Sequence, residues 1–144
     1  MIAVLNGANL NMLGRRDLTQ YGSLTLSELE SRVYAWAGEI NLTARCFQTN
    51  HEGALIDHIH EAAGWATGMI VNPGAWTHYS YAIRDALEIV AAPVVEVHLS
   101  DIATREEWRR QSVIRDVVDH AIAGEGPDGY RLALEWLRGT LAHG

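Results

Sequence analysis

The sequence contains no lysine, and its eleven permanently positive side chains are all arginines. A protein imine needs a lysine amine, so pyridoxal phosphate enzymes and Schiff-base aldolases are excluded. Phosphate-binding loops that depend on a lysine are excluded for the same reason. Any chemistry that this chain performs must use other side chains.

Cysteine is nearly as scarce. Cys46 is the only one, so no disulfide can form within the chain, and its position in an apolar run predicts a buried thiol in a reducing compartment. The N-terminus lacks the pattern of a signal peptide, and no apolar run approaches membrane-spanning length. We therefore expect a soluble, cytoplasmic protein.

Positive charge is also limited. The formal net charge is −7, without the concentrated basic patch that nucleic acids or anionic membranes require. A small molecule or another protein is the favoured partner. The length of 144 residues suits a single domain, which we place at 1–144.

Short apolar runs alternate with amphipathic segments along the chain. The runs predict strands at 2–5, 42–48, 68–71, 94–97 and in the second half of 117–123. A long loop is expected at 7–26, and a capping box at Ser27 and Glu30 predicts that the first helix starts there. Further helices are expected at 55–63, at about 78–90 and at 130–141, with one helical turn near 105–111. This alternation predicts an α/β fold with a parallel sheet covered on both faces.

Four of the apolar runs stop at polar residues, often beside glycine or proline. The junctions are Asn6-Gly7, Asn50-His51, Asn72-Pro73-Gly74 and His98-Leu99-Ser100. Because the carboxyl ends of parallel strands face one crevice, these groups are expected to converge on a ligand. The pattern gives Asn50-His51 no particular role.

The fourth junction carries a possible proton donor. Glu96 and His98 have the same side-chain parity on one strand, so they should project from the same face. A carboxylate beside an imidazole fixes its tautomer and stabilises the protonated ring. The pair fits either a general acid or a structural His–Glu contact.

The first loop carries a possible base. Arg16 and Tyr21 lie between Gly14 and Gly22, which could act as hinges of a lid at about 14–22. A nearby guanidinium stabilises a phenolate by charge attraction, which would let the tyrosine accept a proton. A surface turn with scattered polar residues fits this segment equally well.

Two further groups contain side chains that could bind a ligand. The turn from Asn72 to His78 suits the binding of hydroxyl or carboxylate groups, although an ordinary Asn-Pro-Gly turn gives the same pattern. His58 and His60 face different sides of a predicted helix, so no metal site is expected there.

Five motifs, in order along nearly the whole chain, closely resemble type II 3-dehydroquinate dehydratase. That family implies a flavodoxin-like, three-layer fold with a five-stranded parallel sheet. It also implies anti elimination of water from 3-dehydroquinate through an enolate, giving 3-dehydroshikimate without metal or cofactor. The motifs cover Asn6–Asn11 with Gly14–Gly22, Gln48–Gly53, Asn72–His78, Glu96–Ser100 and Gly126–Tyr130.

When the family's functional residues are matched to this sequence by position, the resemblance implies a base and an acid on opposite faces of the substrate. Tyr21 would remove a proton from carbon 2, with Arg16 favouring its phenolate. His98, oriented by Glu96, would protonate the departing hydroxyl on carbon 1. Asn9 would help to hold a water near the enolate oxygen.

The resemblance also implies binding residues and an assembly. Leu99 and Ser100 would hold the substrate carboxylate, and Asn72, His78 and Arg109 the ring hydroxyls. Asp85 would reach the site of a neighbouring subunit, because the family forms trimers that assemble into dodecamers.

Several residues depart from the family pattern and leave the chemistry in place: Ala8, Asp17, Leu18, Asp101 and Ala103. Three alternatives stay open: a paralogue acting on a related cyclic acid, a binding protein that kept the pocket, and a flavodoxin-like nucleotide-binding module. A pure binder has no need of both an acid and a base, and no phosphate-cradling loop is present. The reaction serves both aromatic biosynthesis and quinate breakdown, and the sequence favours neither.

Overall fold

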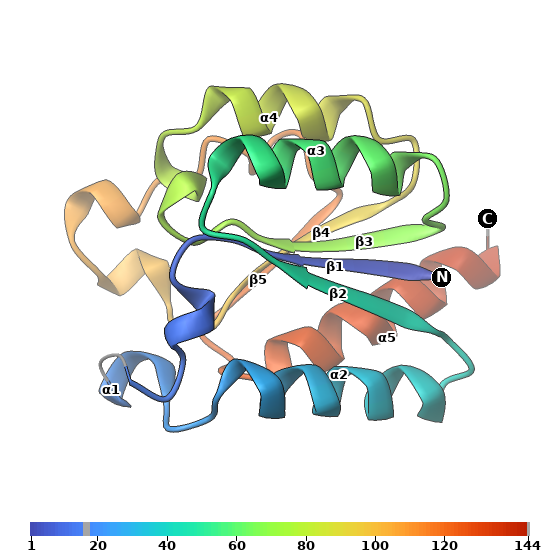
Figure 1. Ribbon diagram of the computed structural model, residues 1–144, viewed down its shortest axis with the longest axis horizontal. Helices are drawn as coiled ribbons and strands as arrows, with labels where there is room; N and C mark the ends of the chain where they lie inside the picture. Colours follow the sequence, from blue (N-terminus) through green and yellow to red (C-terminus); the bar gives the residue numbers. More distant parts are fainter. Residues whose placement is uncertain (16–17, 144) are drawn as a thin grey trace.

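The chain folds into a five-stranded, all-parallel sheet with helices on both faces (Figure 1). The computed structural model describes residues 1–15 and 18–143, and of Gln20, Tyr21 and His143 it describes the backbone alone. The strand order is β2-β1-β3-β4-β5, the order of flavodoxin-like folds. The predicted fold class is confirmed. The strands are β1 (Ile2–Asn6), β2 (Ala44–Gln48), β3 (Gly68–Asn72), β4 (Val94–His98) and β5 (His120–Ala123).

The three central strands are buried along their whole length. Helices cover both faces of the sheet, so both sets of alternating side chains are mostly apolar. In β1, Ile2 and Val4 belong to one core cluster and Ala3 and Leu5 to the other. Continuous apolar runs therefore became central strands, as predicted.

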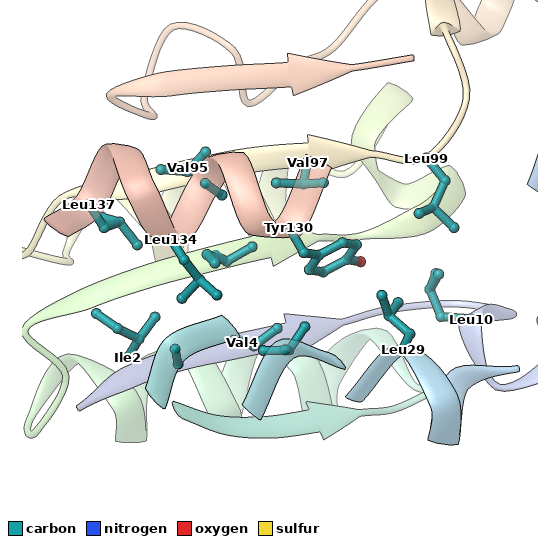
Figure 2. Packing of buried hydrophobic residues seen from close by; sticks show 14 of the residues in the cluster. Ile2, Val4, Leu10, Leu29, Val95, Val97, Leu99, Tyr130, Leu134 and Leu137 are labelled. Carbon is teal, nitrogen blue, oxygen red and sulfur yellow. The ribbon is translucent and has the colours of Figure 1, made fainter. Parts of the chain in front are cut away.

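Two pairs of helices form the outer layers. Helices α2 (Leu26–Glu39) and α5 (Asp128–His143) cover one face, and α3 (Glu52–Ala63) and α4 (Tyr81–Glu88) cover the other (Figure 1). Figure 2 shows Leu134 and Leu137 of α5 packed over the sheet in the first of these cores. The packing holds all five strands with their carboxyl ends at one edge.

The first long helix begins earlier than predicted. Thr25 is its N-cap: the Thr25 hydroxyl accepts a hydrogen bond from the Glu28 backbone N–H at 3.2 Å. The Glu28 carboxylate in turn accepts from the Thr25 N–H at 3.3 Å. The predicted box at Ser27 and Glu30 is wrong, because Ser27 already lies inside the helix.

The helix predicted at about 78–90 is confirmed as α4 (Tyr81–Glu88), which is shorter than predicted at both ends. A 3-10 helix, η2 (Gly74–His78), ends where Tyr79 adopts extended φ, and α4 starts after Ser80, whose hydroxyl accepts from the Ile83 N–H at 3.1 Å. This break leaves His78 at the end of η2 and outside α4, at the carboxyl edge of the sheet.

The connections at this edge contain short elements. The loop predicted at 7–26 holds a 3-10 helix, η1 (Leu10–Met12), and one helical turn, α1 (Leu18–Tyr21). After β4 come the 3-10 helices η3 (Ile102–Thr104) and η4 (Glu107–Arg109), the second within the predicted turn. In the described ranges no helix is long and apolar enough to cross a membrane.

Cys46 lies half-buried on β2. Burial raises the pKa of its thiol to about 12. A thiol with so little thiolate at neutral pH is a poor nucleophile, in keeping with the predicted packing role.

Candidate active site

A pocket lies at the carboxyl edge of the sheet, where β1, β3 and β4 end. Its empty volume is about 560 Å³, part of it open to solvent. Seven of the predicted site residues line it: Asn9, Asn72, His78, His98, Leu99, Ser100 and Arg109. The convergence predicted from the strand ends is therefore confirmed for two of the four junctions, those at Asn72 and at His98. Asn6 and Gly7 do not line the pocket, but the loop that follows them brings Asn9 to it.

His98 meets Glu96 at the wall of this pocket. The two side chains project from the same face of β4, and Nε2 of His98 lies 2.5 Å from Oε2 of Glu96. Both are buried, Glu96 almost completely. Because Nε2 is engaged, Nδ1 is the ring nitrogen left for a ligand. The predicted pairing of the two residues is confirmed.

His78 approaches His98 from η2, with the two rings stacked at a centroid distance of 6.4 Å. Nδ1 of His78 lies 2.6 Å from the Gln111 carbonyl oxygen, so Nδ1 must carry a proton and donate it. Burial lowers the pKa of His78, and the nearby His98 and Arg109 lower it further against the opposing effect of the Gln111 carbonyl. A neutral ring then keeps a lone pair on Nε2, which suits a ligand hydroxyl.

Among the described residues, two arginines line the pocket and bring positive charge to it. Arg109 binds the Glu106 carboxylate at 2.5 Å, and its guanidinium lies 4.0 Å from the centroid of the Trp108 ring. Arg105, which the sequence reasoning missed, donates from Nη1 to the Ser100 hydroxyl at 3.1 Å. Guanidinium groups held in this way suit carboxylate and hydroxyl ligands.

The turns after β1 and β3 touch each other at two glycines. A Cβ on Gly7 would lie 2.4 Å from the Pro73 carbonyl oxygen, and a Cβ on Gly74, whose φ is +67°, would lie 2.6 Å from the Ala8 carbonyl oxygen. No larger residue fits either position without moving backbone. The contact joins the turn that leads to Asn9 with the turn that follows Asn72, and both residues line the pocket.

Asn50 holds the first of these turns. Its Oδ1 atom accepts hydrogen bonds from the Asn9 backbone N–H at 2.9 Å and from Gln48 Nε2 at 3.1 Å. Asn9 itself has left-handed backbone, with φ of 69°. The junction that the sequence left without a role therefore fixes the start of the first loop.

A buried tyrosine joins the ends of β1 and β3. The Tyr130 hydroxyl donates to Asn6 Oδ1 at 2.6 Å and accepts from Asn72 Nδ2 at 3.1 Å. Burial raises the pKa of Tyr130, so the phenol stays protonated. Sequence reasoning placed Tyr130 on the apolar face of a helix and missed this contact, because both partners lie far away in the chain.

Three predicted site residues stand apart. Asp85 lies exposed on α4 and does not line the pocket. Arg16 lies outside the described residues, as does the side chain of Tyr21, whose backbone ends α1. Leu18 and Gly22 line a neighbouring hollow together with Leu99 and Ser100, so these two residues lie beside the pocket.

Comparison with known proteins decides the family. The model of the family described as "Dehydroquinase class II" matches residues 1–138. The chain belongs to this family. The 3-dehydroquinate dehydratase of Pelobacter propionicus is 52% identical over 134 residues, covering 92% of this chain and 90% of its own. That of Thermotoga neapolitana is 52% identical over 137 residues, covering 95% and 93%.

Solved structures of class II dehydroquinases have the same fold. The type II dehydroquinase from Propionibacterium acnes superposes with a TM-score of 0.93 at 46% identity, covering 96% of this chain and 95% of its own. A 3-dehydroquinate dehydratase-like protein from Bifidobacterium longum gives a TM-score of 0.73 at 29% identity, covering 98% and 97%. The resemblance drawn from the five motifs is confirmed.

Proposed function

We propose that this class II dehydroquinase removes water from 3-dehydroquinate by anti elimination through an enolate, giving 3-dehydroshikimate. As a dehydratase it is a hydro-lyase. The observation that carries the mechanism is the buried contact between His98 and Glu96 in the pocket wall. No cofactor takes part in the proposed steps.

His98 is the proposed general acid. Glu96 holds Nε2, so the imidazolium would donate from Nδ1 to the hydroxyl that leaves carbon 1 as water. The negative charge of Glu96 stabilises the protonated ring before the transfer, and the buried setting keeps the ring in one orientation. His98 is then a rigid donor at the end of a central strand.

Tyr21 is the proposed base. As a phenolate favoured by Arg16, it would take the carbon 2 proton on the substrate face opposite His98, and the enolate would then form at the adjacent ketone. The position of α1 at the carboxyl edge of the sheet supports this role (Figure 1). Asn9, which lines the pocket floor, would hold a water near the enolate oxygen.

The remaining polar groups would bind the substrate. Leu99 and Ser100 would hold its carboxylate, with Arg105 fixing the Ser100 hydroxyl. Asn72, His78 and Arg109 would hold the ring hydroxyls, His78 as an acceptor through Nε2.

The assembly belongs to the same proposal. Asp85 is exposed on α4 and does not line the pocket of its own chain, so we propose that it serves the site of a neighbouring subunit. A dodecamer built from trimers would supply that neighbour. Light scattering on the purified protein tests this, and a monomeric particle with full activity would contradict it.

The test of the reaction follows the absorbance of the conjugated product with purified protein and 3-dehydroquinate. Wild type should turn over, and Tyr21→Phe and His98→Ala should each lose at least about a hundredfold in kcat. Tyr34→Phe removes a distant hydroxyl, bonded to the Cys46 backbone N–H at 3.2 Å, and should keep wild-type kcat. Absent turnover in wild type, or near-wild-type turnover in Tyr21→Phe, would contradict the proposal.

A further inference from the structure

We infer that Tyr130 is a positioning residue for substrate binding: its hydroxyl, held between Asn6 and Asn72, presents the Asn72 amide to the ring hydroxyls. The inference rests on the proposed function, in which Asn72 binds those hydroxyls. Tyr130 does not line the pocket, so it acts through Asn72.

The direction of each hydrogen bond in this group is determined. The Gly74 backbone N–H can only donate, and it lies 3.2 Å from Asn72 Oδ1, so the Asn72 oxygen must face Gly74. Asn72 Nδ2 then faces Tyr130 and donates to its hydroxyl at 3.1 Å. The Tyr130 hydroxyl must in turn donate its own proton to Asn6 Oδ1 at 2.6 Å.

These three hydrogen bonds hold Asn72 in one orientation. They leave one hydrogen of its amide group that Tyr130 does not use. The amide lies at the pocket wall, and its exposed fraction is 5%. A donor fixed before the ligand arrives loses little entropy on binding. The Asn72 amide is therefore preorganised to donate to a ligand oxygen.

Tyr130 is itself held rigidly. It is fully buried in the core between the sheet and α2 and α5. Figure 2 shows its ring reaching from α5 toward the sheet, with the hydroxyl pointing to the end where Leu10 and Leu99 lie. The hydroxyl thereby couples α5 to the ends of two adjacent strands, Asn6 and Asn72 being register partners.

Removal of the hydroxyl has a specific expected effect. In Tyr130→Phe the ring still fills the core, but Asn72 Nδ2 and Asn6 Oδ1 lose their shared partner. The Asn72 amide then keeps only its contact with the Gly74 N–H and is held less firmly, so substrate should bind less tightly while the acid and base stay in place. We expect KM to rise about tenfold, with kcat changed by less than about threefold.

The test compares steady-state kinetics and product inhibition by 3-dehydroshikimate in wild type, Tyr130→Phe, Asn72→Ala and the double variant. KM and the inhibition constant should rise together in Tyr130→Phe. In the double variant the rise should be smaller than the product of the two single effects, because both changes remove the same amide contact. Tyr34→Phe, which also loses a hydroxyl bonded outside the pocket, should keep wild-type KM.

The outcomes separate this inference from the proposed function. Absent turnover in wild type refutes the function. Normal turnover in wild type with unchanged KM in Tyr130→Phe, or with fully multiplicative effects in the double variant, overturns the inference. If Tyr130→Phe does not fold, Asn6→Ala decides, since it removes the acceptor of the same hydroxyl: a raised KM supports the inference and an unchanged KM overturns it.

Discussion

Nε2 of His98 lies 2.5 Å from Oε2 of Glu96, and the exposed fractions of the two side chains are 7% and 1%. A carboxylate is rarely buried this completely without a partner. Its other oxygen, Oε1, is buried and has no hydrogen-bond partner among the described residues. Glu96 therefore depends on His98 for the hydrogen bond to its buried carboxylate, and this bond holds the His98 ring in one orientation at the pocket wall.

Replacement of Glu96 by glutamine tests this dependence. Glu96→Gln keeps the shape but removes the charge that stabilises the imidazolium, so kcat should fall at least about tenfold with little change in KM. Steady-state kinetics measure both constants. Glu39→Gln, at an exposed position of α2, should leave both unchanged. An unaltered kcat in Glu96→Gln would show that Glu96 plays only a structural part.

The lowered pKa of His78 predicts a pH dependence of stability. The folded protein keeps the ring neutral at pH values where the unfolded chain, with the ordinary pKa of 6.5, binds a proton. The contribution of His78 to the free energy of unfolding is therefore present above pH 6.5 and is lost as pH falls toward the lowered pKa. Protonation also removes the Nε2 lone pair.

Urea unfolding at pH 7.5 and pH 5.5 measures this effect. Wild type should lose more stability between the two pH values than His78→Gln does. His60→Gln, at an exposed position of α3, should lose as much as wild type. An equal loss in wild type and His78→Gln would refute the prediction.

The two possible capping boxes of α2 can be separated by mutation. Thr25→Ala removes the hydroxyl that accepts from the Glu28 N–H, so the free energy of unfolding should fall by about 1 kcal/mol. Ser27 lies inside the helix, so Ser27→Ala should change the free energy of unfolding by less than about 0.5 kcal/mol. Chemical denaturation measures both. A larger effect at Ser27 would favour the box predicted from the sequence.

The contact between the turns after β1 and β3 predicts a severe glycine substitution. In Gly7→Ala the new methyl would lie 2.4 Å from the Pro73 carbonyl oxygen, so the protein should lose roughly 2–4 kcal/mol of stability. Gly38→Ala in α2 meets nothing within 4 Å and should stabilise by up to about 1 kcal/mol. Thermal unfolding compares the two, and a neutral Gly7→Ala would contradict the contact.

The sequence was informative where local pattern decides structure. Continuous apolar runs predicted the strands, and the shared parity of Glu96 and His98 predicted their contact. The start of α2 was mispredicted because Thr25 and Ser27 both satisfy the same local rule, and only the folded chain selects one of them.

Two of the missed contributions depend on contacts between residues far apart in the chain. Asn50 holds Asn9 across 41 residues, and the Tyr130 hydroxyl reaches Asn6 across 124. No periodicity or spacing predicts which polar atoms meet over such separations. The Tyr130 ring fits the apolar face of a helix, and nothing in the local sequence indicates a hydrogen-bond partner for its hydroxyl. Arg105 was missed because the segment after β4 has no regular pattern.

In the proposed reaction, acid and base act on opposite faces of the substrate. The direct test uses 3-dehydroquinate carrying deuterium at one defined hydrogen of carbon 2, with the label in the product read by mass spectrometry. Deuterium anti to the carbon 1 hydroxyl should be lost on conversion to 3-dehydroshikimate, and deuterium syn to it should be retained. Retention of the anti label, or loss of the syn label, would contradict the account.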